Sequence, residues 1–220
     1  MTLTLVLFDV DGTLVDSQAH IMGAMELAFD VAGMECPSRE QVLAIVGLSL
    51  DQAFFRLAPE ASQEKRIELR EGYKQGFQTL RKTQDLSPLY PGALDCLREL
   101  NAQDDIVLGV ATGKSRRGLD HVLDSHNLRY MFVTTQVADD HPSKPHPAMA
   151  QTAMLESGAD TGIMIGDTTY DMEMGHAAGL KTLAVTWGYQ PAQALRPHAD
   201  HVIDHFGQTT TAIETLRSAR

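Results

Sequence analysis

The sequence has few cysteines and no hydrophobic run long enough to cross a membrane. Cys36 and Cys96 lie far apart, and neither belongs to a Cys-x-x-Cys motif. We therefore expect two free, buried thiols and no disulfide framework. The chain begins directly with an expected strand, without a basic segment or a longer apolar leader. These features predict a cytoplasmic protein with no membrane partner.

Positive charge is also scarce. The 18 Lys and Arg residues face 29 Asp and Glu residues, which gives a formal net charge of -11 at pH 7. This balance argues against a nucleic-acid partner, because a phosphate backbone attracts basic surfaces. An anionic substrate would have to be attracted locally, by a metal ion and a few placed cations. The Gly-x-Ser-x-Gly and His-Glu-x-x-His motifs are absent too, which removes the common serine and zinc hydrolases.

The most informative stretch is the apolar run Leu5–Phe8, which ends in two acids and a glycine. A short, uninterrupted apolar run is typical of a parallel strand buried on both faces. Asp9 and Asp11 are two residues apart, so an extended backbone would place both carboxylates on one side of the strand's carboxyl end. Gly12 then permits a sharp turn. The pair indicates a metal ion or divergent pKa values, although Asp and Gly are also ordinary turn residues.

A change of pattern after the first strand indicates an insertion. Between residues 17 and 85 only helices are expected: one to about Val31, two that begin at Ser38 and Ser49 in Ser-x-x-Gln capping boxes, and a charged one over 62–80. This gap is too long for an ordinary connection between strands. We therefore expect an α/β core domain of residues 1–16 and 86–220, with a helical insert of residues 17–85.

The rest of the chain alternates between strands and helices. Strands are expected at 106–111, 131–134, 162–166, 181–186 and 202–203, with helices at 93–101, 116–126, 147–157 and 170–178. A last helix is expected to open at Thr211, boxed by Glu214. This repetition predicts a doubly wound parallel sheet with helices on both faces.

Two positions after the insert carry groups suited to phosphate. Thr112 and Gly113 follow the second strand, where a hydroxyl and an exposed amide can bind a phosphate, although an isolated Thr is also a common helix cap. Lys144 lies in the loop His-Pro-Ser-Lys-Pro-His-Pro, whose prolines would hold the ammonium in a fixed place. Arg116 and Arg117 could attract an anion, but we expect them to be solvated in a first helical turn.

Acidic residues also follow the strand expected at 162–166. Asp167 and Asp171 belong to the string Gly-Asp-Thr-Thr-Tyr-Asp, which repeats the pattern of a buried strand ending in glycine and acids. Carboxylate oxygens are ligands that Mg²⁺ prefers, and a magnesium site usually takes few of them together with water and phosphate. The alternative is helix capping, since Asp is favoured in a first helical turn.

Together these strings resemble the four signatures of the haloacid dehalogenase superfamily. The strings are Asp-Val-Asp-Gly-Thr at 9–13, Thr-Gly at 112–113, Lys-Pro at 144–145 and Gly-Asp-Thr-x-x-Asp at 166–171. Tyr-Pro-Gly at 90–92 and Lys-Pro-His-Pro at 144–147 are similar to the phosphoglycolate phosphatase subgroup of its magnesium-dependent phosphatases. The resemblance covers the whole chain and implies that the helical insert is a C1-type cap over the active site.

The resemblance also implies roles for the site residues. Asp9 would be the nucleophile that forms an aspartyl-phosphate, and Asp11 the general acid and base. The catalytic set would be Asp9, Asp11, Thr112 and Lys144. The phosphate-binding set would be Gly12, Thr112, Gly113 and Lys144. The Mg²⁺ ligands would be Asp9, Asp11, Asp167 and Asp171, with Asp11 offering its main-chain carbonyl.

Several functions stay open at this point. A dehalogenase is disfavoured, because that branch of the family carries no acid at the position of Asp11. A sugar phosphomutase or a pyrophosphatase would keep all four signatures. A receiver-like phospho-acceptor has no place for the helical insert, and a non-catalytic binding protein of the same fold would not need the intact acids.

The expected substrate is a small phosphorylated metabolite, with 2-phosphoglycolate as the candidate that the resemblance suggests. Neither the loop at 47–52 nor the hinge at 16–17, where the family's cap sets specificity, offers a decisive cation for a carboxylate. A monomer and a homodimer are both open.

Overall fold

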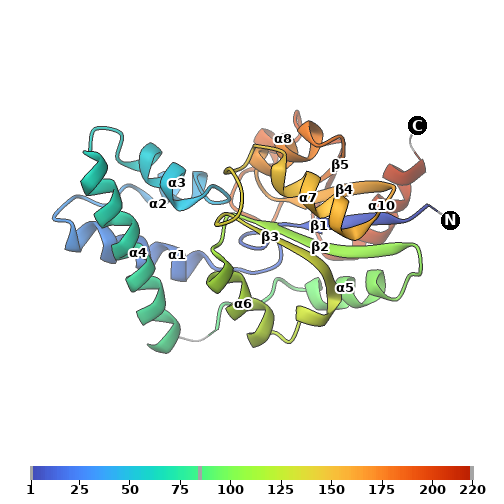
Figure 1. Cartoon of the computed structure of the whole chain (residues 1–220), viewed down its shortest axis with the longest axis horizontal. Coiled ribbons are helices and arrows are strands. Elements are labelled where there is room, and N and C mark those ends of the chain that lie inside the picture. Colours follow the sequence, from blue (N-terminus) through green and yellow to red (C-terminus); the bar gives the residue numbers. More distant parts are fainter. Residues whose placement is uncertain (1, 84–85, 219–220) are drawn as a thin grey trace.

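A computed structural model describes residues 2–83 and 86–218 of the chain. Its centre is a six-stranded parallel sheet with the strand order β3-β2-β1-β4-β5-β6 (Figure 1). The strands are β1 (Thr4–Phe8), β2 (Ile106–Thr112), β3 (Phe132–Val137), β4 (Thr161–Gly166), β5 (Lys181–Val185) and β6 (His201–Ile203). The predicted parallel α/β sheet is confirmed.

Helices connect the strands. The α-helices are α1 (Gln18–Val31), α2 (Arg39–Ala44), α3 (Leu50–Leu57), α4 (Gln63–Thr83), α5 (Ala93–Asn101), α6 (Arg116–Ser125), α7 (Ala148–Ser157), α8 (Thr169–Ala177), α9 (Ala192–Leu195) and α10 (Thr209–Ser218). Two short 3-10 helices are η1 (Arg129–Met131) and η2 (Phe206–Gln208). Within the described residues, no helix is both long and apolar enough to pass through a bilayer.

Strand β1 lies in the middle of the sheet and determines where the acids meet. All side chains from Leu5 to Phe8 are fully buried, as expected for a strand covered on both faces. Phe8 is in register with Val110 of β2 and Ile165 of β4. The carboxyl ends of these three neighbouring strands therefore lie at one edge of the sheet, where open α/β sheets bind their ligands.

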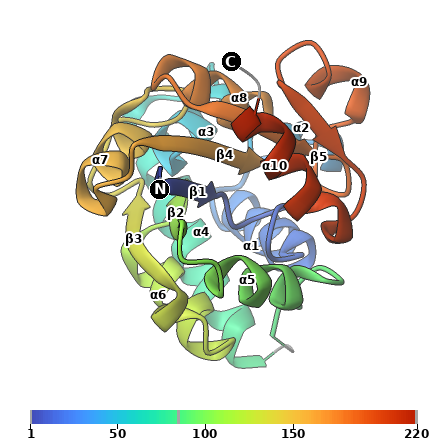
Figure 2. The same ribbon diagram turned by 90° about the vertical axis from the view of Figure 1, so that its right-hand side faces the viewer.

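Helices cover both faces of the sheet (Figure 2). Side chains of α5, α6 and α10 form one apolar core with β1, β2 and β4, in which Leu97, Leu119 and Ile213 are buried. On the opposite face, α7 and α8 bury Met149 and Met174 against Leu5 and Leu7 of β1. The doubly wound arrangement follows from these two separate apolar layers.

The segment between β1 and β2 begins with a helical layer that has its own core. Residues 18–83 contain helices and no strand, and α1 and α4 pack side by side (Figure 1). Their apolar faces enclose Phe29, Phe54 and Leu69, which form a cluster separate from those around the sheet. The helical content agrees with the expected insert, while its division from the core domain at 16/17 and 85/86 stays a prediction. Asp85 itself lies outside the described residues.

Three local expectations were wrong. The Ser49 side chain does not cap α3; instead, the Ser49 backbone N–H donates to Ser143 Oγ at 2.8 Å, so the core completes this helix end. The last helix begins at Thr209, because the 3-10 turn η2 runs directly into it, and Thr211 is therefore internal. Both thiols are free as expected, but Cys36 is only half-buried while Cys96 is buried.

The helical core generates a stability prediction from adjacent phenylalanines on α3. Phe54 is fully buried, whereas Phe55 is 56% exposed. Phe54→Ala leaves a cavity and should lower the free energy of unfolding by about 3–5 kcal/mol. Phe55→Ala loses only a contact beneath the Arg66 guanidinium and should cost less than about 1 kcal/mol. Urea unfolding followed by far-ultraviolet circular dichroism measures both, and equal losses would contradict this packing.

Candidate active site

Three buried carboxylates meet at the carboxyl edge of the sheet. Asp9 follows β1, Asp167 follows the neighbouring β4, and Asp171 lies in the first turn of α8. Each offers one oxygen within 4.8 Å of the others, and none of the three side chains is more than 1% exposed. Three acids buried together would repel one another strongly, so the cluster needs positive charge.

Lys144 supplies one positive charge to this cluster. Its Nζ donates to Asp9 Oδ1 at 2.8 Å and to Asp171 Oδ1 at 2.6 Å, and its side chain is fully buried. Burial disfavours the ammonium, but the carboxylates of Asp171 and Asp9 outweigh this effect, so the pKa of Lys144 lies above its usual value. The prolines on both sides of Lys144 belong to the loop between β3 and α7 that presents this cation.

One cation does not balance three acids. Burial raises the pKa of Asp9 to about 7, with Lys144 opposing the shift and Asp171 adding to it. Burial also raises the pKa of Asp167 well above its ordinary value, and the neighbouring acids add to that shift. Asp9 Oδ2 is buried without a hydrogen-bond donor. An orphaned carboxylate oxygen beside two further acids fits a divalent cation, because hard cations prefer oxygen ligands.

The other carboxylate oxygens are held in place by donors. Asp167 accepts from Thr13 Oγ1 at 3.0 Å and from the Tyr189 backbone N–H at 2.8 Å. Asp171 Oδ2 accepts from the backbone N–H and the hydroxyl of Thr168 in a capping box. Asp171 therefore both caps α8 and belongs to the cluster, so the two interpretations of its sequence position are compatible.

The Asp11 carboxylate points to a different set of partners. Its two oxygens accept from Lys114 Nζ at 2.6 and 2.7 Å, and one of them also accepts from the Ser17 hydroxyl. The chain turns between the two acids, since Gly12 has φ +88°. A Cβ at Gly12 would lie 2.2 Å from Asp167 Oδ2, so only glycine allows this turn against the cluster. The part of the Asp11 main-chain carbonyl in metal binding stays a prediction.

Thr112 and Gly113 lie where the helical insert meets the core. Thr112 is buried at the end of β2, and its hydroxyl accepts from the Lys114 backbone N–H at 3.3 Å. A Cβ at Gly113 would lie 2.6 Å from the Gly47 carbonyl oxygen and 2.7 Å from that of Leu48. The loop before α3 thus rests directly on Gly113, and a larger residue would hold the insert away from the core.

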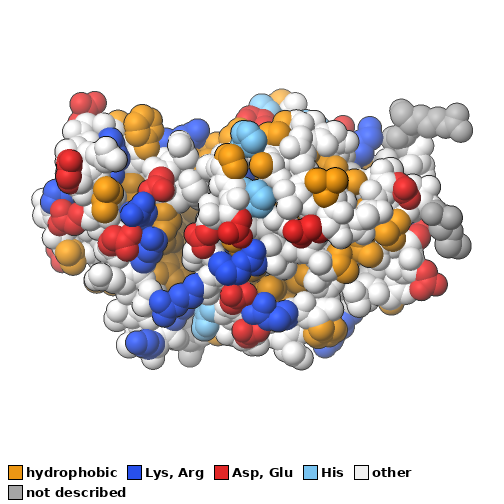
Figure 3. All heavy atoms as spheres, in the orientation of Figure 1, with side chains coloured by type: hydrophobic (Ala, Val, Ile, Leu, Met, Phe, Trp, Pro, Cys, Tyr) orange, Lys and Arg blue, Asp and Glu red, His pale blue; other side chains and the backbone are white. Residues whose placement is uncertain are grey.

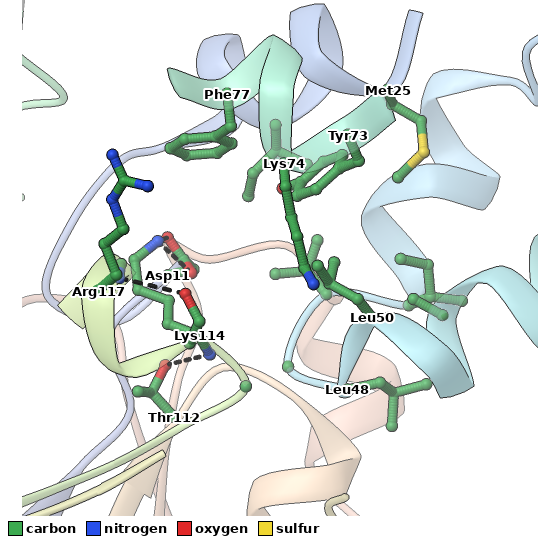
Figure 4. Close-up of a pocket in the computed structure, with 18 of the residues that line it drawn as sticks. Asp11, Met25, Leu48, Leu50, Tyr73, Lys74, Phe77, Thr112, Lys114 and Arg117 are labelled. Atoms are coloured by element: carbon green, nitrogen blue, oxygen red, sulfur yellow. Dashed lines mark hydrogen bonds and ion pairs between the residues drawn. The ribbon is translucent and has the colours of Figure 1, made fainter. Parts of the chain in front are cut away.

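A cavity of about 330 Å³ opens between the insert and the core (Figure 4). Asp9, Asp11, Thr112 and Gly113 lie on its core side. The insert contributes an apolar wall from α1, α3, α4 and the loop before α3. This wall comprises Ile21, Met25, Ile45, Val46, Leu48, Leu50, Ala53, Tyr73 and Phe77. The geometry suits an anionic group at the acids with an organic part against the wall.

Comparison with known proteins identifies the family. The sequence profile of the haloacid dehalogenase-like hydrolases matches residues 6–185. The chain belongs to this family. Similarity extends over whole proteins: the probable phosphatase IndB of Dickeya dadantii is 34% identical over 218 residues, which cover 96% of this chain and 94% of that protein.

Other relatives of this haloacid dehalogenase-like chain carry more specific names. A phosphoglycolate phosphatase of Vibrio cholerae is 30% identical over 94% of this chain and 95% of its own length. The pyrophosphatase PpaX of Oceanobacillus iheyensis is 28% identical over 97% and 98%, respectively. A solved haloacid dehalogenase-like hydrolase of Bacteroides fragilis superposes with a TM-score of 0.86 at 25% identity, over 94% and 99% of the two chains. The resemblance to phosphoglycolate phosphatase-like hydrolases is thereby confirmed.

Sequence reasoning missed several residues of this hydrolase site. Lys114 stands next to Thr112 and Gly113, yet nothing in the sequence showed that it would pair with Asp11. Tyr189 contacts both halves of the site, because its hydroxyl lies 3.0 Å from Ser17 Oγ while its backbone binds Asp167. Its distance in sequence from every motif leaves no local signal that could have identified it.

The buried charge cluster predicts a pH-dependent cost of removing Lys144. In the presence of a metal chelator, Lys144→Met should lower the free energy of unfolding by about 3–5 kcal/mol at pH 7, because the buried carboxylates of Asp9 and Asp171 lose the ammonium that binds them. Asp9 titrates near its ordinary value of 3.8 in the unfolded chain and near 7 in the fold. Protonation of Asp9 therefore stabilises the fold at low pH, and this contribution is lost as pH rises from 3.8 to about 7. Because a protonated Asp9 needs no counter-cation, Lys144→Met should lower the free energy of unfolding less at pH 5 than at pH 7.

Urea unfolding at both pH values measures the Lys144 effect relative to the parent protein. Lys65→Met is the control, since the partly exposed Lys65 donates to Glu68 and to the Ala32 carbonyl away from the acids, and its loss should cost about 1 kcal/mol, equally at both pH values. A loss for Lys144→Met that is as large at pH 5 as at pH 7 would contradict the charge argument.

Proposed function

We propose that this protein is a Mg²⁺-dependent phosphatase that acts through an aspartyl-phosphate on a small phosphorylated metabolite. The observation that carries the proposal is Asp9: a buried carboxylate on the cavity wall, with one oxygen bound by Lys144 and the other without a partner. A nucleophilic carboxylate needs a free oxygen directed at its substrate and positive charge nearby, and Asp9 has both.

In the first step, Asp9 attacks phosphorus and the bond from phosphorus to the ester oxygen breaks. Asp11, which lies on the cavity wall, gives its proton to the departing alkoxide. In the second step, Asp11 takes a proton from water as that water attacks phosphorus. The bond between phosphorus and Asp9 then breaks, which releases inorganic phosphate. Lys114 and Ser17 hold the Asp11 carboxylate between these steps.

Charge on the transferring phosphoryl group would be met by Gly12, Thr112, Gly113 and Lys144. Fixed donors and charges of this kind usually provide most of the rate acceleration in phosphoryl transfer. Mg²⁺ would be held by Asp9, Asp167 and the Asp11 main-chain carbonyl, with Asp171 orienting the site, and when bound it supplies Lewis-acid neutralisation of the phosphate. The orphaned Asp9 oxygen supports this assignment.

The cavity favours an organic phosphate ester over pyrophosphate, because the apolar wall of the insert has nothing to contact in an inorganic substrate. 2-Phosphoglycolate is a candidate through the name of the Vibrio cholerae relative. A sugar phosphomutase remains the alternative that the same acids would serve. Intact nucleophile, cation and cavity argue against a non-catalytic protein. The cytoplasmic location and the lack of nucleic-acid and membrane partners stay predictions.

Two isosteric variants test the mechanism. Asp9→Asn should abolish phosphate release, because the amide is a poor nucleophile. Asp11→Asn should reduce turnover by roughly a hundredfold or more, the usual scale for a general acid and base. Phosphate release from an aryl phosphate, 2-phosphoglycolate, sugar phosphates, nucleotides and pyrophosphate, with and without Mg²⁺, is the measurement. Asp95→Asn, an exposed change with the same loss of charge, should retain activity.

Metal binding is followed separately by the rise in melting temperature on adding Mg²⁺. We expect this rise in the parent protein and in Asp11→Asn, and a smaller one in Asp167→Asn. Near-normal turnover in Asp11→Asn would remove Asp11 from its role. Hydrolysis of no ester, combined with a lasting requirement for a sugar bisphosphate, would favour the mutase.

A further inference from the structure

The cavity carries positive charge in addition to Lys114, which binds Asp11, and Lys144, which binds Asp9. Lys74 and Arg81 enter its lining from α4 of the insert, and Arg117 enters from the first turn of α6 in the core. Figure 4 shows Lys74 descending from α4 into the space, with Arg117 rising from the opposite side toward Phe77. These three residues, termed the distal cations below, belong to none of the four signatures.

In the part of the chain that the structure describes, few acids bond to the distal cations. Within residues 2–83 and 86–218, neither Arg81 nor Arg117 takes part in an ion pair. Among the described residues, Lys74 pairs with Glu71 on its own helix at 3.0 Å, and the two side chains are 43% and 46% exposed. Besides Asp9 and Asp11, the acid that lines the cavity is Asp139, whose carboxylate accepts from the Arg116 backbone N–H at 2.8 Å.

Arg81 joins the two sides of the cavity. Its guanidinium lies 4.6 Å from the centre of the Phe77 ring, and a Cβ at Gly118 would lie 3.7 Å from Arg81 Nη2. A side chain of α4 thus reaches the first turn of α6, beside Arg117. Burial lowers the pKa of Arg81 and the charge of Arg117 lowers it further, while the Asp11 carboxylate and Tyr73 oppose the shift. Arg81 is half-buried, whereas Arg117 is exposed. Two neighbouring guanidinium groups are both stabilised when an anion binds between them.

This concentration of cations is unusual in a chain with a net charge of -11. Figure 3 shows Lys and Arg side chains on both sides of the hollow between the α4 side and the α6 side of the molecule. Lys114 also lines the cavity, but it is committed to Asp11, so it serves the catalytic end. The distal cations are therefore available to a ligand that already has its phosphate at Asp9.

We propose that the preferred substrate is a phosphate monoester with a second anionic group, which Arg117 and Arg81 bind with support from Lys74. This inference rests on the proposed phosphatase function. The second anion can be a carboxylate or another phosphate, since guanidinium groups bind both. The carbon skeleton between the two anions lies along the apolar wall, against Tyr73 and Phe77.

The test compares pairs of substrates in which one member carries the second anionic group and the other carries an uncharged group in its place. 2-Phosphoglycolate is compared with 2-phosphoglycolamide, and a hexose bisphosphate with the corresponding monophosphate, as kcat/KM in the Mg²⁺-loaded full-length protein. In the parent protein, the substrate with the second anionic group should be preferred roughly ten- to hundredfold in at least one of the two pairs, the scale of a hydrogen-bonded charge. If 2-phosphoglycolate is preferred over its amide, the second anion that the distal cations bind is a carboxylate. If the hexose bisphosphate is preferred over the monophosphate, it is a phosphate.

Arg117→Met and Arg81→Met should remove most of this preference, chiefly through a higher KM of the substrate that carries the second anionic group. Arg117→Lys should restore part of it, because charge returns without the bidentate geometry. Arg116→Met is the matched control. Arg116 is adjacent and carries the same charge, but it bonds Thr135 and Asp140 outside the cavity, so its loss should leave the preference in place.

An aryl phosphate separates the two levels of the proposal. Hydrolysis of the aryl phosphate with no preference in either substrate pair overturns the distal site and leaves the phosphatase intact. If Arg116→Met weakens the preference as much as Arg117→Met does, the distal site is also overturned, because the preference would then come from the overall positive charge of this surface and not from a contact with Arg117. Failure to hydrolyse any ester, the aryl phosphate included, overturns the phosphatase itself.

Discussion

The structure depends most on the buried contact between Lys144 and the carboxylates of Asp9 and Asp171. These groups come from three distant parts of the chain, and each would be costly to bury alone. The fold brings them together because β1 and β4 are neighbours, so their carboxyl ends carry Asp9 and Asp167 to one point. The cluster remains short of positive charge, which raises the pKa of Asp9 and leaves an oxygen without a partner. The excess negative charge of this cluster favours binding of a metal cation, and such a cation could in turn bind a phosphate.

A second constraint is the close contact between the helical insert and the core. The Gly47 carbonyl approaches Gly113, the Ser49 N–H binds Ser143 one residue before Lys144, and Tyr170 donates to the Ala44 carbonyl at 3.2 Å. These contacts place the loop before α3 directly over Gly113 and beside the loop that carries Lys144. Water around the acids is thereby restricted, which strengthens every charge interaction in the site. The insert thus contributes both a wall for the organic part of a ligand and a lower dielectric environment for the reaction.

Much of this arrangement could be predicted from the sequence, because its signals are local. The apolar run before Asp9, the glycine after Asp11 and the alternation after residue 90 each follow from a few adjacent residues. The features that could not be predicted depend on partners distant in sequence. The Ser49 backbone N–H binds Ser143 of the core while its side chain caps nothing, and Lys114 binds the Asp11 carboxylate. Tyr189 contacts Ser17 and Asp167, and Arg81 of α4 approaches Gly118 of α6. No local sequence pattern predicts that these segments meet.

The distal cations show why substrate preference is harder to infer than reaction type. The expectation that the insert offers no decisive cation considered the loop at 47–52 and the hinge, and it holds for those segments. Lys74 and Arg81 lie instead on the long helix α4, where a charged face is typical of a solvated helix. Arg81 comes near Arg117 only in the folded chain, where its side chain reaches from α4 to Gly118 in the first turn of α6. In the proposed mechanism the reaction depends on residues at one sheet edge, whereas the proposed substrate preference depends on an interface between two parts of the chain, so the preference can change while the four signatures stay fixed.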